Sequence, residues 1–246
     1  MTACLPQPPL EQVSVLGLPL HLHQNYIGWL AHRLDQGRST HVVTLNAEMS
    51  MQADQNPNLT ASIHQADLVI PDGSGVVLYL RFRGYQSHRT PGIDVAEGLL
   101  KAAASHHWSV CFYGGKPQTP EMAQAYWQHQ YPDLAIVKAQ HGYIDAAQEA
   151  DFLTELAEKQ PQIILVGLGV PRQELWIHQH RSLCPRSIWM GVGGSFDIWA
   201  GNKKRAPQWF QEHYLEWMYR LYQEPWRWRR MMALPQFAWK SLQWKD

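Results

Sequence analysis

The sequence has few cysteines, little charge and no long apolar run. Charged residues make up 17% of the chain, against about 25% in a typical soluble protein. No apolar run reaches the roughly 18 to 20 residues that span a bilayer, so we expect no transmembrane helix. Residues 1–20 lack a basic segment and carry prolines and a glutamate, so they do not resemble a signal peptide. The chain has three scattered cysteines, Cys4, Cys111 and Cys184. This excludes a disulfide scaffold and favours the reducing interior of a cell.

Several catalytic and cofactor motifs are also missing. The chain has no DxD pair to hold a nucleotide sugar through a metal, and neither GxSxG nor HExxH occurs. The absence of GxGxxG argues against a dinucleotide-dependent oxidoreductase. The 13 histidines are scattered, and HLH at 21–23 lacks companion ligands at metal spacing. We therefore expect no metal site.

The charge and the tryptophans are unevenly distributed. Apolar and aromatic contents of 45% and 11% exclude disorder, and 246 residues fit one large domain or a domain with an appendage. Residues 1–202 carry 12 basic and 17 acidic side chains, whereas residues 203–246 carry 9 and 4. Six of the 12 tryptophans lie in the last 38 residues. This tail predicts contact with a membrane surface, a phosphate or a nucleic acid.

Apolar runs typical of strands alternate with helical patterns. The expected strands are 12–20, 41–48, 67–77 (running into a glycine-rich turn), 110–115, 134–140, 162–169 and 187–194. The expected helices are 23–37, 49–66 with a break near Pro57, 94–105, about 12 residues from Thr119, 145–159 and 172–183. This alternation predicts an α/β fold, with a mostly parallel sheet covered by helices on both faces.

Polar residues and glycines gather at the carboxyl ends of these strands, where such sheets bind ligands. They are Thr44, Asn46, Asp72, Gly73, Gly75, Gly114, Gly115, Gly167, Gly169, Gly193 and Gly194. Asp72 suits a general base or a partner for a hydroxyl, but on this motif alone an Asp-Gly turn is the favoured interpretation. Gly114 and Gly115 precede a helix and fit an anion site or a simple turn equally well. Glu174 fits simple stabilisation by the helix dipole, and Gln173 suits recognition of a hydroxyl or a base edge; the structural and the functional interpretation are about equally good.

The tail combines an aromatic pattern with arginines. Phe210, Tyr214, Trp217 and Leu221 have the spacing of one helical stripe. Arg220, Arg227 and Arg230 have spacings that align on a helix, but Pro225 breaks the pattern. An ordinary helix packed on the core is one interpretation. We favour a membrane-surface or diphosphate-binding appendage, because Trp and Tyr suit the headgroup level and Arg suits phosphates.

Nine fragments together carry a family resemblance. They are TLNAE (44–48), PDGSGVV (71–77), RTPGIDV (89–95), FYGG (112–115), HGY (141–143), VGLGVPRQE (166–174), GVGGSFD (191–197), AGNKKRAPQW (200–209) and EWMYRLYQEPWRWRR (216–230). Their order and spacing resemble the WecG/TagA/CpsF glycosyltransferases over residues 12–231.

The resemblance implies a function. It implies a Rossmann-like catalytic domain over 1–202 and a membrane-associating helical appendage over 203–246. It also implies an inverting, metal-independent transfer that uses no cofactor. N-acetylmannosamine or a relative would pass from a UDP-sugar to a polyprenyl-diphosphate-linked sugar, typically undecaprenyl-diphosphate-N-acetylglucosamine. The place would be the cytoplasmic membrane face, and the product would enter cell-surface polysaccharide.

The same resemblance assigns roles to residues. Asp72 would be the general base, with Arg89 as its catalytic partner. Residues expected to bind substrate are Thr44, Asn46, Gly73, Gly114, Gly115, Gln173, Glu174, Arg205, Arg220, Arg227 and Arg230. Without a metal, guanidinium groups would supply the positive charge on the departing diphosphate.

Other functions stay open at this stage. A non-catalytic nucleotide- or lipid-binding regulator on the same fold is the main alternative, and Asp72, Arg89 and the tail arginines argue against it. Nucleic acid is not an expected partner, because the body is acidic. A homo-oligomer is one alternative for the assembly, since a tail that closes a crevice also offers a surface to a neighbour.

Overall fold

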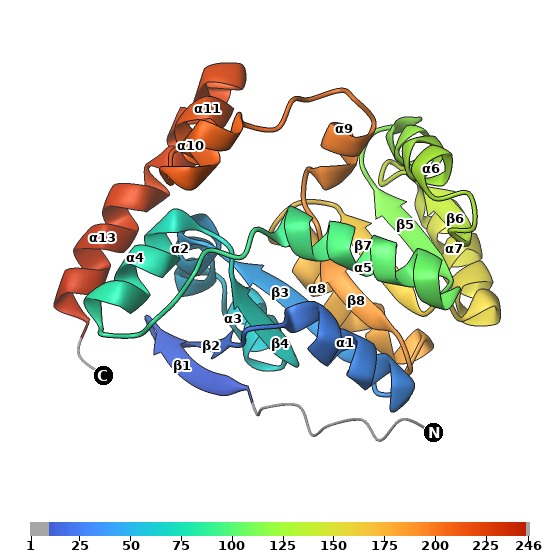
Figure 1. Cartoon of the computed structure of the whole chain (residues 1–246), viewed down its shortest axis with the longest axis horizontal. Coiled ribbons are helices and arrows are strands. Elements are labelled where there is room, and N and C mark those ends of the chain that lie inside the picture. Colours follow the sequence, from blue (N-terminus) through green and yellow to red (C-terminus); the bar gives the residue numbers. More distant parts are fainter. Residues whose placement is uncertain (1–9, 245–246) are drawn as a thin grey trace.

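The computed structural model describes residues 10–244, and a parallel sheet forms its centre (Figure 1). The six strands lie in the order β4-β3-β8-β7-β5-β6, and every pair is parallel. Their bounds are β3 Thr40–Leu45, β4 Leu68–Pro71, β5 Val110–Gly114, β6 Ile136–Gln140, β7 Ile163–Gly167 and β8 Ile188–Gly191. The expected parallel α/β sheet is confirmed.

Alternate side chains of each strand enter different cores. On β3, Val42 enters the core on one face of the sheet, whereas Val43 enters the core on the other face. Helices on the first face are α1 Tyr26–Asp35, α5 Gly92–His106, α6 Thr119–Gln130 and α9 Ser195–Trp199. Those on the second are α2 Ala47–Gln55, α3 Pro57–His64, α7 Ala146–Lys159 and α8 Arg172–His180. Helices therefore cover both faces, as continuous apolar strands require.

The N-terminal strand expected over 12–20 is wrong. The chain forms an antiparallel hairpin there, with β1 Glu11–Val15 and β2 Leu18–Leu22. Leu16 and Gly17 have φ of 53° and 81° and make the turn. Because two residues with positive φ give the twist that a tight hairpin needs, Gly17 inside the apolar run marks the turn.

The strand expected over 67–77 is too long. β4 ends at Pro71, and helix α4 Ser74–Phe82 begins after Gly73. The β-branched and aromatic residues of α4 are typical of a strand. However, Val76 and Leu80, four residues apart, are buried, so tertiary packing decides for a helix. The predicted break between α2 and α3 at Pro57 is confirmed.

The tail consists of short helices rather than one amphipathic helix. They are α10 Gln208–Glu212, α11 Glu216–Gln223, the 3-10 turn η2 Pro225–Arg227, α12 Trp228–Met231 and α13 Ala233–Gln243. The expected stripe from Phe210 to Leu221 is wrong, because Tyr214 has φ +61° and breaks the helix there. In Figure 1, α13 lies beside α4 and α2, and Phe237 packs edge-on against Tyr79. The boundary at residue 202 stays a prediction.

Cysteines and membrane spans can be assessed for the described residues only. Cys111 and Cys184 are buried free thiols, and burial raises the pKa of Cys184 to about 11. Cys4 lies outside the described residues. Between residues 10 and 244, no helix is both long enough and apolar enough to cross a bilayer.

Replacing Gly114 by Ala is expected to lower the free energy of unfolding by about 3 kcal/mol or more. Gly114 has φ +124°, and a Cβ there would lie 2.5 Å from the carbonyl group of Gly167. Backbone strain and overpacking each cost roughly 1 to 3 kcal/mol. Gly84→Ala is the matched control, since Gly84 has φ +86° but open space around it. Chemical denaturation measures the free energy of unfolding of both variants. An equal decrease in the two variants would contradict the clash at Gly114.

Candidate active site

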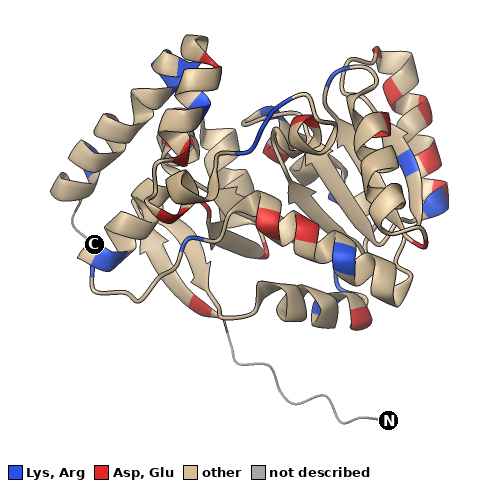
Figure 2. Cartoon of the chain, turned by 45° about the horizontal axis from the view of Figure 1, so that its top comes forward, with Lys and Arg blue, Asp and Glu red and all other residues tan. Residues whose placement is uncertain are grey.

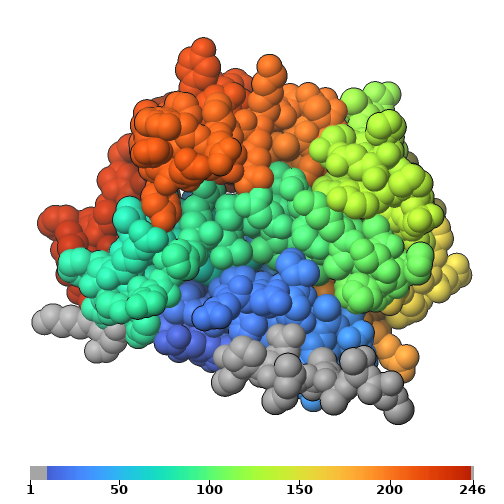
Figure 3. Space-filling model, in the orientation of Figure 1, coloured from blue at the N-terminus to red at the C-terminus, as the bar shows by residue number. Residues whose placement is uncertain are grey.

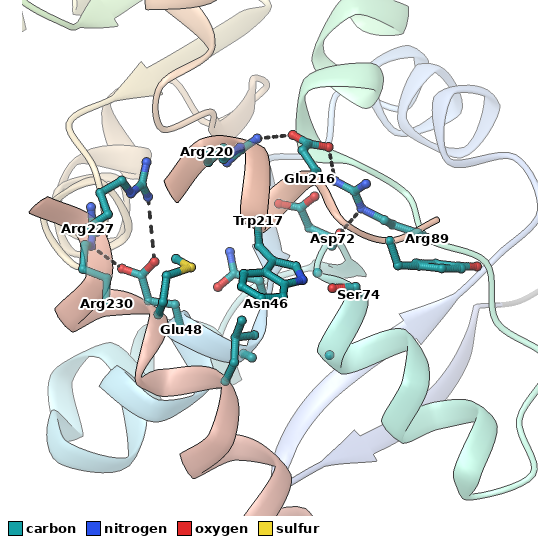
Figure 4. Close-up of a pocket in the computed structure, with 16 residues that line it drawn as sticks. Asn46, Glu48, Asp72, Ser74, Arg89, Glu216, Trp217, Arg220, Arg227 and Arg230 are labelled. Atoms are coloured by element: carbon teal, nitrogen blue, oxygen red, sulfur yellow. Dashed lines mark hydrogen bonds and ion pairs between the residues drawn. The ribbon is translucent and has the colours of Figure 1, made fainter. Parts of the chain in front are cut away.

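Two cavities meet at the carboxyl ends of β3 and β4. The larger, of about 520 Å³, lies along the ends of β3, β7 and β8 and under the loop that precedes α10. The smaller, of about 110 Å³, lies between the start of α4 and the tail (Figure 4). The residues shared by both walls are Asn46, Glu48, Asp72, Glu216, Arg220, Arg227 and Arg230. One reacting group can therefore face a ligand in each cavity.

Asp72 lies at this junction and is held firmly. Its N–H donates to the carbonyl oxygen of Leu45 at 3.0 Å, which ties it to β3. Its carboxylate Oδ1 accepts a hydrogen bond from the N–H of Gly92 at 3.1 Å. Burial raises the pKa of Asp72, Arg89 and Arg220 oppose that rise, and Glu216 adds to it. A carboxylate with a raised pKa is a stronger base, as proton abstraction requires.

Glu216 joins Arg89 of the body to Arg220 of the tail (Figure 4). Arg89 Nε donates to the carbonyl oxygen of Asp72 at 3.0 Å, and its Nη2 lies 2.5 Å from Glu216 Oε2. Arg220 Nη2 lies 2.6 Å from Glu216 Oε1. Although burial favours the protonated acid, Arg220 and Arg89 hold the pKa of Glu216 below its ordinary value. The carboxylate therefore stays charged between two guanidinium groups.

Glu48 makes a second link between body and tail. It lies in the first turn of α2, and its Oε1 accepts from Arg230 Nε at 2.6 Å. Arg227 Nη2 lies 3.9 Å from Glu48 Oε2, and its Nη1 donates to Glu224 at 2.9 Å. Arg220, Arg227 and Arg230 thus all line the same junction, even though they come from α11, η2 and α12. Arg220 and Arg230 remain nearly half exposed, so they can also reach a ligand.

Thr44, Asn46 and Gly73 lie where the sequence places them, at the cavity walls. Thr44 is the buried penultimate residue of β3. Asn46 caps α2 by accepting from the N–H of Met49 at 2.9 Å. Gly73 lies so close to Asn46 that a Cβ would come within 2.7 Å of that side chain. The carboxyl ends of β3 and β4 therefore lie in close contact at the cavity walls.

Gln173 and Glu174 form a buried polar cluster behind the larger cavity. Gln173 lines the cavity, and its Oε1 accepts from the N–H groups of Gly169 and Gly193 at 3.2 and 3.1 Å. Its Nε2 donates to Glu174 at 2.9 Å, and the other oxygen of Glu174 lies 2.9 Å from His41 Nε2. Glu174 is fully buried. Gln173 thus fixes two glycine-rich loops, and Glu174 holds Gln173.

Gly114 and Gly115 lie at the end of β5, where backbone groups of Gly115 are already hydrogen-bonded. Gly115 N–H donates to the carbonyl of Gly167 at 3.0 Å, and its own carbonyl accepts from Gly142. Among the described residues, neither glycine belongs to the wall of either cavity. Their role in substrate binding stays a prediction.

The loop before α10 runs from the body to the tail and carries basic residues, which are drawn blue in Figure 2. Arg205 lines the larger cavity and lies 2.6 Å from Asp94 of α5. Lys203 bridges Asp197 and Glu224, each at 3.1 Å. In Figure 3 the orange surface of α10 and α11 lies directly on the teal and green surface of α4 and α5. Ion pairs therefore hold the tail down on both sides of the site.

The sequence reasoning missed the carboxylates that hold the arginines. Glu48, Glu216 and Glu224 were not considered as site residues, and neither was Lys203. A signal existed, because Glu216 and Arg220 have the i,i+4 spacing of a helical ion pair. The contacts to Glu48 and Arg89 join residues more than 100 positions apart, so no local pattern marks them.

The comparison with known proteins gives the family. A family model described as "Glycosyl transferase WecG/TagA/CpsF family" matches residues 13–246. The chain therefore belongs to the WecG/TagA/CpsF glycosyltransferase family. It is a glycosyltransferase, as the resemblance of its motifs predicts.

Three relatives carry the name N-acetylglucosaminyldiphosphoundecaprenol N-acetyl-beta-D-mannosaminyltransferase. The protein of Bacillus spizizenii is 38% identical over 237 residues, which cover 94% of this chain and 88% of that protein. The Bacillus subtilis protein is 34% identical over 209 residues, which cover 84% and 80%. A Staphylococcus aureus protein is 36% identical over 200 residues, which cover 81% and 78%.

Proposed function

We propose that this chain transfers N-acetylmannosamine from its UDP-sugar to N-acetylglucosamine linked through a diphosphate to undecaprenol. The product would serve the synthesis of a cell-surface polymer. The names of the relatives support the substrates. The observation that carries the mechanism is the place of Asp72, at the junction of two cavities and beside arginines from body and tail.

In the proposed mechanism, the larger cavity holds the UDP-sugar and the smaller holds the acceptor sugar. Asp72 takes the proton of the acceptor hydroxyl, whose oxygen attacks the anomeric carbon. The bond from that carbon to the diphosphate oxygen breaks, and the electron pair stays with UDP. Attack from the face opposite the leaving group inverts the anomeric centre, which fits the "beta" in the relatives' name.

The arginines supply the charge stabilisation in this proposal. Arg220, Arg227 and Arg230 hold the diphosphate through guanidinium N–H groups that their carboxylate partners leave available, since guanidinium groups match phosphate oxygens well. Arg89 fixes the backbone of Asp72. In this proposal the arginines, rather than a bound metal ion, neutralise the charge that develops on the departing diphosphate.

A UDP-release assay tests the proposed reaction. The chain is incubated with UDP-N-acetylmannosamine and a short polyprenyl-diphosphate-N-acetylglucosamine, and other UDP-sugars are run in parallel. UDP is expected to form fastest with UDP-N-acetylmannosamine and only when the acceptor is present. Binding of UDP-sugar without acceptor-dependent release would instead favour a non-catalytic binding protein.

Residues 203–246 would also attach the chain to the cytoplasmic face of the membrane. Large apolar side chains of the tail are more than half exposed, and arginines accompany them: Trp209, Tyr222, Trp226, Trp228, Trp239 and Leu242. Tryptophan and tyrosine suit the headgroup level of a bilayer, and arginine suits anionic lipid. A lipid-linked acceptor would make such attachment useful.

Replacing Trp226 and Trp228 together by Ser is expected to weaken vesicle binding tenfold or more, since burying one large apolar side chain contributes about 1.5 to 3 kcal/mol. Co-sedimentation with phosphatidylglycerol–phosphatidylcholine vesicles measures the change. Tyr126→Ser on α6 is the control, because Tyr126 is an exposed aromatic residue of the body. Unchanged sedimentation of the double variant would contradict membrane attachment through this part of the tail.

A further inference from the structure

Glu216 is the most buried acid in the described part of the tail, and it lies between two guanidinium groups. Its side chain is 6% exposed, whereas that of Arg220, one turn later in the same helix, is 46% exposed. A buried carboxylate is costly unless it is paired and hydrogen-bonded. Glu216 meets this requirement with one arginine on each side (Figure 4).

The contacts of Glu216 form a continuous chain to the reacting group. Glu216 accepts from Arg89, and Arg89 donates through a different nitrogen to the carbonyl oxygen of Asp72. Glu216 uses one terminal nitrogen of each arginine, so the other donors of Arg220 stay available at the junction of the cavities. Because the side chain of Glu216 is so much less exposed than that of Arg220, a ligand at the junction would mainly meet Arg220.

We propose that Glu216 is a positioning residue, which ties the tail to the body, sets the places of Arg89 and Arg220, and lowers the net positive charge around Asp72. The inference rests on the proposed function, in which Asp72 is the base. It adds a residue that touches no reacting atom and acts through the two arginines.

The charge of Glu216 also matters to Asp72. Two cations face Asp72, Arg89 from the loop before α5 and Arg220 from α11. Glu216 is the acidic side chain that acts on Asp72 together with these two arginines. Glu48, Arg227 and Arg230 lie at the same junction. Glu216 offsets the two arginines, so it helps to keep the pKa of Asp72 raised. A neutral residue at position 216 would leave Asp72 with a lower pKa and make it a weaker base.

Asp72 must be ionised to accept a proton, so the rate falls as the pH drops through its pKa. Glu216→Gln lowers that pKa, so the acid limb of the rate profile moves to lower pH. Glu216→Asp keeps the charge, so the limb stays near its original place, although the shorter side chain holds the arginines less well.

The experiment compares Glu216→Gln, Glu216→Asp and Glu212→Gln. Glu212 is the control, because it is exposed, lies four residues earlier and takes part in neither cavity wall. At neutral pH, Glu216→Gln is expected to lower kcat/KM for the acceptor about ten- to a hundred-fold, the usual effect of losing a charged hydrogen bond. Glu212→Gln is expected to match the original protein in rate and pH profile.

Hydrogen exchange of the amides in 208–223 supplies a second readout. Exchange is expected to be faster in Glu216→Gln than in Glu212→Gln, because a neutral amide ties the tail less firmly. Original kinetics and an unmoved acid limb in Glu216→Gln would overturn the proposal. The proposal would also be overturned if kcat/KM fell further in Glu216→Asp than in Glu216→Gln while the acid limb of Glu216→Gln stayed in place. Packing rather than charge would then matter.

The two proposals fail in distinguishable ways. If the original protein transfers no sugar, the proposed function fails, and the exchange rates still show whether Glu216 ties down the tail. If the original protein is active and Glu216→Gln behaves like it, only the role of Glu216 fails. If Glu216→Gln does not fold, the Glu216→Asp variant decides: it must fold, keep the acid limb and show faster exchange than Glu212→Gln.

Discussion

Asp72→Asn is expected to lower the transfer rate about a thousandfold, in the range that loss of a general base produces. Asparagine has nearly the same shape, so its side-chain oxygen can still accept from the N–H of Gly92, as the carboxylate does. The fold and the binding of UDP-sugar should therefore change little. What disappears is the group that takes the proton of the acceptor hydroxyl.

The pH dependence makes this prediction sharper. Burial raises the pKa of Asp72, so the original enzyme should lose activity on acidification at a higher pH than an exposed aspartate would give. The residual rate of Asp72→Asn should lack this acid limb. Asp133→Asn, at an exposed aspartate far along the chain, is the control. Full activity of Asp72→Asn with purified acceptor would remove Asp72 from the mechanism.

Replacing Arg227 and Arg230 together by Ala is expected to lower kcat/KM a hundredfold or more. A hydrogen bond to a charged group contributes about 1.5 to 3 kcal/mol, which corresponds to roughly ten- to a hundred-fold for each arginine. The double variant also leaves Glu48 at the junction without its partners from the tail. The uncompensated acid would repel a diphosphate and add to the loss.

Arg229→Ala provides the matched control for this double variant. Arg229 lies between the two arginines in sequence, is exposed and stacks on Trp228, and it belongs to neither cavity wall. Steady-state kinetics with varied acceptor should show Arg229→Ala close to the original enzyme. An equal decrease of kcat/KM in the control and the double variant would mean that the positive charge of the tail as a whole, rather than the place of the arginines at the junction, causes the effect.

The sheet could be predicted from the sequence because each strand is a continuous apolar run followed by a helix. The same logic placed Thr44, Asn46 and Asp72 together, since the carboxyl ends of parallel strands share one edge of a sheet. All three line the larger cavity. The part of the site that depends on strand ends was therefore accessible from local patterns.

The predictions that were wrong concern segments whose structure depends on packing against distant parts of the chain. The sequence of α4 is typical of a strand, but its apolar residues become buried against α13 and the N-terminal hairpin. The tail was expected to carry one helical stripe, whereas the positive φ of Tyr214 turns the chain so that α11 can reach Arg89. Glu48 and Glu216 gain their importance from partners far away in sequence, which no spacing rule reveals.

The most direct test of the central claim is the mass of the lipid-linked product. The enzyme is incubated with UDP-N-acetylmannosamine and a polyprenyl-diphosphate-N-acetylglucosamine, and the lipid fraction is analysed by mass spectrometry. We expect the acceptor to gain the mass of one N-acetylhexosamine residue, and the Asp72→Asn enzyme to yield almost none of this product. An acceptor of unchanged mass with the original enzyme would contradict the central claim.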